Sequence, residues 1–296
     1  MTALSIILAT THRWPEVEST LSSIFAGDTP DGLEVILCDG HGAGAPPLST
    51  RDPRLRVVTA AGESVFALRA RGLGLAQGAV VAMTEDHCVA APDWTRELLA
   101  AHARHPEAVA IAGAVTNGAA ERAWDWANFL MTFADHLPPM PDARTVRAPS
   151  VANGSVKREV AFIPANPKPG WLETALMGRL MDAGLVVRDD GPRVSHVQSH
   201  GGGLATLTAH FHNGRATAGL RAASPGVHAV LDERGRIAAL PAKLTREMRA
   251  ALTSRPPLPG RAAAGARIVP LIAAAHGAGE LTGLLAGVGR SAELLD

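Results

Sequence analysis

Three consecutive polar residues, Glu85, Asp86 and His87, follow an apolar run that ends at Met83. Side chains alternate along an extended segment, so Glu85 and His87 can point one way while Asp86 turns to the other side. A carboxylate and an imidazole presented together can hold one divalent cation. The other interpretation is a solvated loop in which Asp86 caps the turn, because polar triplets are common after strands.

Short apolar runs recur through the first third of the chain, each separated from the next by a helical pattern or a turn. The predicted strands are Leu4–Ala9, Leu33–Cys38, Leu55–Val58, Ala79–Met83 and Ala108–Val115. Strands that alternate with helices at this spacing predict an α/β fold with an open sheet and right-handed crossovers. Ligands of such sheets lie beyond the carboxyl ends of the strands. We therefore expect the segments after Ala9, Cys38 and Met83 to line one crevice.

The composition argues against several function classes. The 296 residues include 28 Lys or Arg and 28 Asp or Glu, so no basic excess exists to neutralise nucleic-acid phosphates. Aromatic residues make up 4% with no Tyr, which argues against a stacking platform for single strands. The chain has no P-loop and no nucleophile elbow. The glycines of residues 40–44 lead into Ala45-Pro46-Pro47 instead of a helix, which disfavours a dinucleotide loop.

Three features bear on cellular location. Cys38 and Cys88 each lie at or next to the end of an apolar run and are typical of buried thiols in a reducing cytosol. Met1–Leu8 has no basic region and too short an apolar run for a signal peptide. Ile268–Gly287 is apolar but rich in Ala and Gly, and it contains Glu280, which favours a packed or membrane-surface helix over a spanning one. We expect a cytoplasmic protein, with peripheral contact to the inner membrane face as an option.

Taken in order, several segments resemble the nucleotide-sugar half of the family 2 glycosyltransferases, which have the GT-A fold, an open mixed sheet flanked by helices. In that family the first strand ends in a Thr-rich turn, matched here by Thr10-Thr11-His12. The second strand ends in an Asp that recognises the nucleoside, matched by Asp39, and Arg69 matches an Arg of the helix before the metal strand. Residues 85–87 fall where the family shows Asp-x-Asp. The resemblance implies nucleotide binding by Thr10, Thr11, Asp39, Arg69 and Asp86.

The resemblance extends to about residue 216. Asn153–Arg158 resembles the small-residue segment that backs the acceptor site. The family has a helix of the pattern Glu-Asp-x-x-Leu-x-x-Arg-Leu-x-x-x-Gly, and aligning Arg179 and Gly184 with it places Glu173 on the position of the catalytic base. The acidic pair of that helix is incomplete, because Leu172 precedes Glu173. One carboxylate is sufficient for a base.

A metal site is also implied, with Glu85, His87 and His196 as its ligands, because Val194-Ser195-His196 resembles the strand whose His completes that site. His87 departs from the family, which has an Asp there. Imidazole in place of a hard anionic ligand favours Mn²⁺ over Mg²⁺. His200 is the alternative to His196. A separate zinc site in the histidine-rich segment stays open although no Cys accompanies it: His196, His200, His210 and His212.

The implied organisation has three parts: a nucleotide-sugar-binding half over residues 1–118, an acceptor-binding half of the same domain over 119–216, and an Ala/Gly/Arg-rich helical extension over 217–296. The expected activity is metal-dependent inverting transfer of a sugar from a UDP- or GDP-type donor to a hydroxyl, on a polysaccharide or a lipid-linked acceptor. The alternative, favoured by the replacement at His87, is a non-catalytic nucleotide-sugar-binding or regulatory protein on the same fold. A nucleotidyltransferase would need a Gly-rich, Lys- or Arg-bearing signature that residues 10–14 do not supply.

Overall fold

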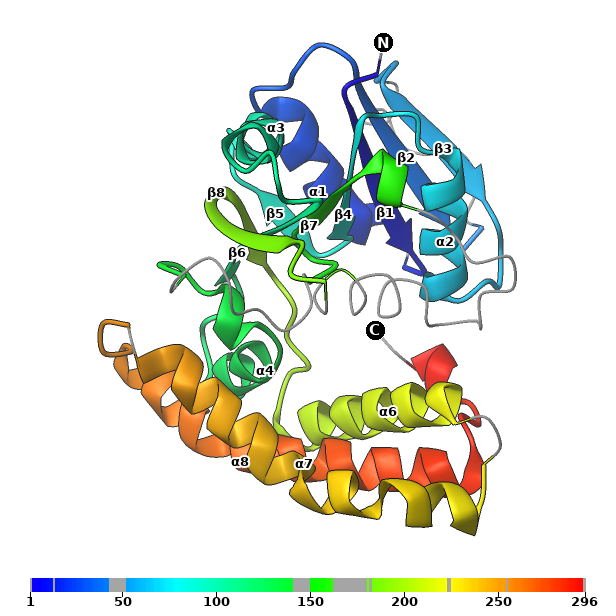
Figure 1. Ribbon diagram of the computed structural model, residues 1–296, viewed down its shortest axis with the longest axis vertical. Helices are drawn as coiled ribbons and strands as arrows, with labels where there is room; N and C mark the ends of the chain where they lie inside the picture. The colour runs from blue at the N-terminus through cyan, green and yellow to red at the C-terminus, as the bar shows by residue number, and fades with distance from the viewer. Residues whose placement is uncertain are drawn as a thin grey trace. The chain divides into compact units, whose positions relative to one another are not determined.

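Figure 1 shows the computed structural model, which describes residues 2–12, 14–42, 52–140, 150–161, 180, 183–222, 225–253 and 255–294. The chain forms two compact units. The first contains residues 1–116 and 136–197, and the second contains residues 117–135 and 198–296. The boundary expected between residues 216 and 217 falls inside a helix of the second unit, α6 (Gly203–Arg221).

The first unit is built on a mixed sheet with the strand order β3-β2-β1-β4-β7-β6-β8-β5. The strands are β1 (Leu4–Thr10), β2 (Leu33–Asp39), β3 (Leu55–Thr59), β4 (Val80–Glu85), β5 (Cys88–Ala90), β6 (Ala110–Asn117), β7 (Gly154–Lys157) and β8 (Val186–His196). The strands β3, β2, β1 and β4 are parallel, whereas β7 runs antiparallel to β4 and β6, and β5 antiparallel to β8. The expected open mixed sheet is confirmed.

Helices cover both faces of the sheet: α2 (Val65–Leu75) on one, and α1 (Trp14–Ala26) with α3 (Trp94–Arg104) on the other (Figure 1). All residues of β1 are buried, as expected for a strand covered on both faces. A Cβ on Gly72 of α2 would lie 2.5 Å from the Ile7 side chain, so glycine lets this helix approach β1 closely.

The second unit is helical, and its helix α8 (Gly260–Ala286) packs against α4 (Ala123–Phe133), α6 and α7 (Val227–Thr253). Three 3₁₀ turns complete the described elements of the chain: η2 (Ala134–His136), η3 (Arg158–Val160) and η4 (Ser291–Leu294). Gly279 and Gly283 of α8 abut backbone oxygens of α6, where any larger residue would collide. These two glycines allow the close contact of α6 with α8.

A buried ion cluster links three helices of this unit. Glu280 of α8 is buried, and its Oε2 accepts hydrogen bonds from Arg221 of α6 and Arg236 of α7. Burial alone would raise the pKa of Glu280, but hydrogen bonds from His276 and Arg236 and the charges of both arginines lower it to about 2. The carboxylate is therefore ionised and paired at neutral pH, as a buried charge must be.

Candidate active site

Three of the predicted site residues lie at the carboxyl ends of adjacent parallel strands. Thr10 ends β1 and is in register with Asp39, which ends β2. Glu85 ends β4 and is in register with Ala9 of β1. The pairing of β4 with β1 runs two residues past the end expected from the sequence, so Glu85 belongs to the strand. Polar side chains gather beyond these strand ends, where the sequence predicted a crevice.

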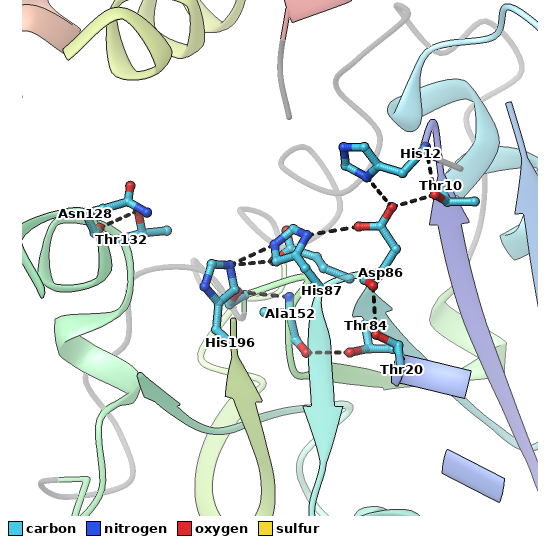
Figure 2. Close-up of polar contacts among 12 residues, drawn as sticks. Thr10, His12, Thr20, Thr84, Asp86, His87, Asn128, Thr132, Ala152 and His196 are labelled. Carbon is cyan, nitrogen blue, oxygen red and sulfur yellow. Dashed lines mark hydrogen bonds and ion pairs between the residues drawn. The ribbon is translucent and has the colours of Figure 1, made fainter. Parts of the chain in front are cut away.

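Glu85, His87 and His196 form one compact group of ligand-type atoms. Figure 2 shows the two histidines of this group facing each other. Glu85 Oε2 lies 3.4 Å from His196 Nε2 and 3.5 Å from His87 Nε2, and the two Nε2 atoms are 2.9 Å apart. The two imidazole rings are perpendicular, with centroids 4.6 Å apart. The structure thus brings together the three residues that the sequence assigned to one metal site.

The sheet brings the two histidines together although they are far apart in the sequence. His87 immediately precedes β5, and Cys88 of β5 is paired with His196 of β8. The N–H of Val197 donates to the carbonyl of His87 at 2.9 Å, which fixes the end of this ladder. The pairing of β5 with β8 therefore sets the distance between the two imidazoles, and a local sequence motif does not.

The donor atoms fit a divalent cation of the first transition series. Donors that share one such ion at about 2.1 Å stand about 3 to 3.5 Å apart, and the observed separations lie close to this range. Glu85 Oε2 is buried and accepts no hydrogen bond within the described residues. Burial alone would raise the pKa of Glu85, but His196 and His87 hold it well below its usual value. The group therefore presents an ionised carboxylate between two imidazoles.

Asp86 turns away from this group, as the alternation of side chains predicted. Its Oδ2 accepts hydrogen bonds from Thr10 Oγ1 at 2.5 Å and from His12 Nδ1 at 2.7 Å, and its Oδ1 faces His87 Nδ1 at 2.9 Å (Figure 2). The hydroxyl of Thr20 in α1 donates to the Asp86 carbonyl. Because an ionised carboxylate only accepts hydrogen bonds, His87 Nδ1 must carry its proton and donate to Asp86. The Nε2 of His87 consequently faces Glu85 and His196.

The two imidazoles differ in their electrostatics. Burial alone would lower the pKa of His87, but hydrogen bonds and charges of Asp86 and Glu85 raise it to about 9. Burial lowers the pKa of His196, and Glu85 compensates only in part. At neutral pH, His87 is therefore a cation that can donate Nε2–H to the neutral His196.

Asp39 is held in a turn that leaves one oxygen unused. Its Oδ1 accepts the backbone N–H groups of His41 at 2.8 Å and Gly42 at 3.0 Å. Gly42 has φ +70°, a backbone conformation that suits glycine. Asp39 Oδ2 is buried and has no hydrogen-bond partner within the described residues. The carboxylate therefore keeps an acceptor for another group. Thr11, just beyond β1, is half-buried.

Arg69, which the resemblance assigns to the nucleotide, contacts the cluster. It lies on the buried face of α2, and its Nη2 is 3.4 Å from Glu85 Oε1. Arg71 instead forms an exposed ion pair with Glu63. Arg69 thus places a fixed positive charge beside the oxygen of Glu85 that does not face the imidazoles.

Several predicted residues lie elsewhere or outside the described part. The base position Glu173 and its alignment marker Arg179 fall outside the described residues, and their roles stay predictions. The cluster contains His196 and not His200. His210 contacts Asn128 at 2.8 Å, whereas His212 contacts Ser291 at 2.9 Å. Within the described residues, the structure assembles no separate histidine cluster of the kind that the zinc alternative required.

The residue that ends the loop before β7, Asn153, holds the framework behind the site. Its Oδ1 accepts the Trp94 indole N–H at 2.8 Å. Its Nδ2 donates to the carbonyls of Ala114 in β6 and Pro192 in β8. Asn153 therefore ties α3 to the strand that carries His196. The acceptor-site role implied for this segment stays a prediction.

Two members of the network, His12 and Thr20, had no site role assigned from the sequence. His12 follows Thr10 by two residues, so the alternation that placed Glu85 with His87 could have placed His12 beside Thr10. Thr20 had a weaker signal, as a polar residue that is buried on the inner face of α1. Its target is a backbone carbonyl, which no residue pattern reveals.

The fold is of the GT-A type. A mannosyltransferase from Pyrobaculum calidifontis, solved in complex with GDP-Man and Mn²⁺, superposes with a TM-score of 0.56 over 95% of this chain and 86% of its own, at 19% identity. Residues 5–154, about half of the chain, match the model of glycosyl transferase family 2. The chain belongs to this family and is a glycosyltransferase. A search of the curated proteins found no match.

Proposed function

We propose that this glycosyltransferase uses a divalent cation and a nucleotide-diphosphate sugar, and that it transfers the sugar to an acceptor hydroxyl with inversion. The observation that carries the proposal is the convergence of Glu85, His87 and His196 beyond the carboxyl ends of the strands. Family membership supplies the reaction class. We also propose a cytoplasmic location, supported by the free and buried thiols of Cys38 and Cys88.

Glu85 Oε2, His87 Nε2 and His196 Nε2 would hold the cation. A bound cation supplies positive charge that neutralises the diphosphate leaving group. Two imidazoles in a set of three donors favour Mn²⁺ over Mg²⁺, which prefers oxygen ligands. The Mn²⁺ bound by the mannosyltransferase of similar fold supports this choice. Arg69 beside Glu85 adds a second, permanent positive charge at the same edge.

The donor nucleotide would lie along the ends of β1 and β2. Asp39 Oδ2, buried and without a partner in the described residues, would accept a hydrogen bond from the nucleobase. Thr11 borders the same edge and would contact the nucleotide directly. Thr10 and Asp86 bond to each other, so we assign both to positioning the site as well as to lining it. The GDP-Man of the similar structure favours a GDP donor, and UDP is the alternative to test.

The chain's own base completes the reaction. The acceptor oxygen attacks the anomeric carbon while the bond from that carbon to the diphosphate oxygen breaks on the opposite face. The acceptor proton passes to the carboxylate of Glu173, and the diphosphate leaves with the bonding electrons. A single displacement of this kind inverts the anomeric configuration. The acceptor is a hydroxyl of a polysaccharide or a lipid-linked glycan.

Calorimetric titration of GDP and of UDP into the folded protein, with Mn²⁺ and with a chelator, tests the proposal. We expect micromolar binding of one nucleotide that requires the metal. His196→Ala should abolish the metal requirement and weaken binding, whereas His200→Ala, which removes a histidine outside the cluster, should bind as wild type. Equal binding in the chelator, or no binding by protein shown to be folded by circular dichroism, would contradict the proposal.

A further inference from the structure

Helix α8 of the second unit presents an apolar stripe to solvent. The stripe consists of Leu271, Ala274, Ala278, Leu281 and Leu285, which follow one another at three- and four-residue steps and are all exposed. Leu271 is 53% exposed and Leu285 is 45% exposed. These positions share one helix face and span about 21 Å along the axis. Apolar side chains repeated along one exposed face mark an interaction surface.

The rest of the helix is committed to the bundle. α4, α6 and α7 pack on α8, and its inner face is buried around Val269, Ile272 and Leu284. By length and composition alone, α8 could cross a membrane, with 44% of its apolar window buried. However, its inner face also carries Glu280, whose ion pairs come from α6 and α7. Extraction of α8 into lipid would leave that carboxylate unpaired, so only the outer stripe can meet lipid.

Exposed basic residues surround one end of this stripe. Lys243, Arg246 and Arg249 follow one another at three-residue steps on the outer face of α7, and Arg261 and Arg267 are exposed near the start of α8. α7 and α8 follow one another in the chain and pack as a helical hairpin, so the end of α7 and the start of α8 lie side by side (Figure 1). Five cations therefore gather at one end of the hairpin.

Most of these basic side chains form no ion pair within the described part of the fold. Lys243 is paired with Glu247 at 3.9 Å. In the described part of the chain, the guanidinium groups of Arg246, Arg249, Arg261 and Arg267 form no ion pair and no hydrogen bond, although the Arg249 carbonyl accepts a hydrogen bond from the Thr253 hydroxyl. The whole chain has a formal net charge of zero, so this accumulation is local. A surface that combines free arginines with an apolar stripe complements an anionic lipid headgroup layer.

We propose that the α7–α8 hairpin docks on the surface of an anionic lipid bilayer. The leucines of the stripe enter the boundary between headgroups and acyl chains, and the arginines contact lipid phosphates. A second copy of the chain is a poorer occupant, because a symmetric contact at this end would bring like charges together. The inference concerns a surface of the second unit and holds or fails independently of the proposed reaction.

Flotation with vesicles of phosphatidylglycerol and phosphatidylcholine, compared with phosphatidylcholine alone, tests docking of the full chain. We expect binding to the anionic vesicles only, weakening as salt rises. The double variant Leu271→Gln with Leu285→Gln should weaken binding at least tenfold for each leucine. Burial of one leucine side chain contributes about the free energy that corresponds to a tenfold change in affinity. Leu204→Gln, which alters an 81% exposed leucine of α6, is the matched control and should bind as wild type.

A second pair of variants tests the charges. Arg246→Gln with Arg249→Gln should weaken binding to anionic vesicles about fivefold for each arginine removed. Arg56→Gln removes an exposed arginine of β3 in the first unit and should have no effect. Absence of binding by folded wild type at low salt, or unchanged binding by the leucine pair, would overturn the proposal. A dimer in sedimentation that Leu271→Gln dissociates would overturn it in favour of a second copy.

Discussion

Asp86→Asn tests whether the carboxylate behind His87 sets up the metal site. The substitution keeps the shape of the side chain but replaces one acceptor oxygen by an NH₂ donor. In the wild type, Asp86 Oδ1 forces His87 to carry its proton on Nδ1, at 2.9 Å. An Asn that turns its NH₂ toward His87 would instead select the tautomer with Nε2–H, which cannot bind a cation. An Asn in the other orientation keeps the tautomer but loses the negative charge.

The expected loss follows from the hydrogen bond that changes. Carboxylates that orient a ligating histidine contribute about 10- to 100-fold in metal affinity, or about 1.4 to 2.7 kcal/mol. Asp86 also raises the pKa of His87. Its removal therefore weakens binding of the proton that competes for His87 Nε2, as well as binding of the metal. Since a divalent ion carries twice the charge of a proton, the effect on the metal is larger. We therefore expect the lower end of the range, about tenfold.

The assay is titration of Mn²⁺ followed by the electron paramagnetic resonance signal of the free ion. Thr10→Val is the matched control, because it removes a hydrogen bond to Oδ2 of the same carboxylate and leaves the His87 side intact. It should bind Mn²⁺ nearly as well as wild type, whereas His87→Ala should bind little. If Asp86→Asn binds Mn²⁺ with the wild-type dissociation constant, Asp86 does not orient His87 and the reasoning fails.

Three further predictions concern the base, the packing of α2 and the acid stability. Glu173→Gln should lower kcat by about 10²- to 10⁴-fold while calorimetry shows unchanged nucleotide binding; loss of binding instead would mean a structural role. Gly72→Ala should destabilise by about 1 to 3 kcal/mol in urea unfolding, because its Cβ would press on Ile7, whereas Gly235→Ala, with open space around it, should stabilise by up to about 1 kcal/mol. The pKa of Glu280 is lowered from 4.5 to about 2, so its contribution is present above pH 4.5 and is lost as the pH falls toward 2. Glu280→Gln should therefore cost on the order of 2 kcal/mol at pH 7 and flatten the stability profile between these pH values.

The strands and their polar ends could be predicted because their signals are local. β1 and β2 are continuous apolar runs, and a run of that kind followed by a polar residue specifies both a buried strand and the edge where its ligand group lies. Alternation within residues 85–87 likewise separated Glu85 and His87 from Asp86. What alternation cannot supply is the partner of the residue that turns away. His12 and Thr20 reach Asp86 only through the parallel sheet and the helix that crosses it.

The second unit could not be delimited from the sequence, because the contacts that define it are non-local. α4 comes from the middle of the chain but packs on α8, where a Cβ on Gly265 would lie 2.6 Å from the Cβ of Trp126. A glycine can indicate that another segment of the chain approaches closely, but it does not identify that segment. The boundary expected near residue 216 consequently cut through α6. Its glycine-mediated contact with α8 is equally non-local.

His87 was the main reason to consider a protein that had lost its activity, since an imidazole replaces an anionic ligand. The structure weakens that reason through Asp86. The carboxylate lies directly behind the imidazole, bonded to its Nδ1 at 2.9 Å, and its own pKa is lowered by His12 and His87 against the effect of burial. A carboxylate and imidazole joined in this way present negative charge to a cation through the ring. The pair of Asp86 and His87 therefore restores much of the charge that the exchange removed, while it retains the preference of imidazole for Mn²⁺. The negative charge that the family supplies at position 87 is thus supplied here by Asp86, one residue earlier.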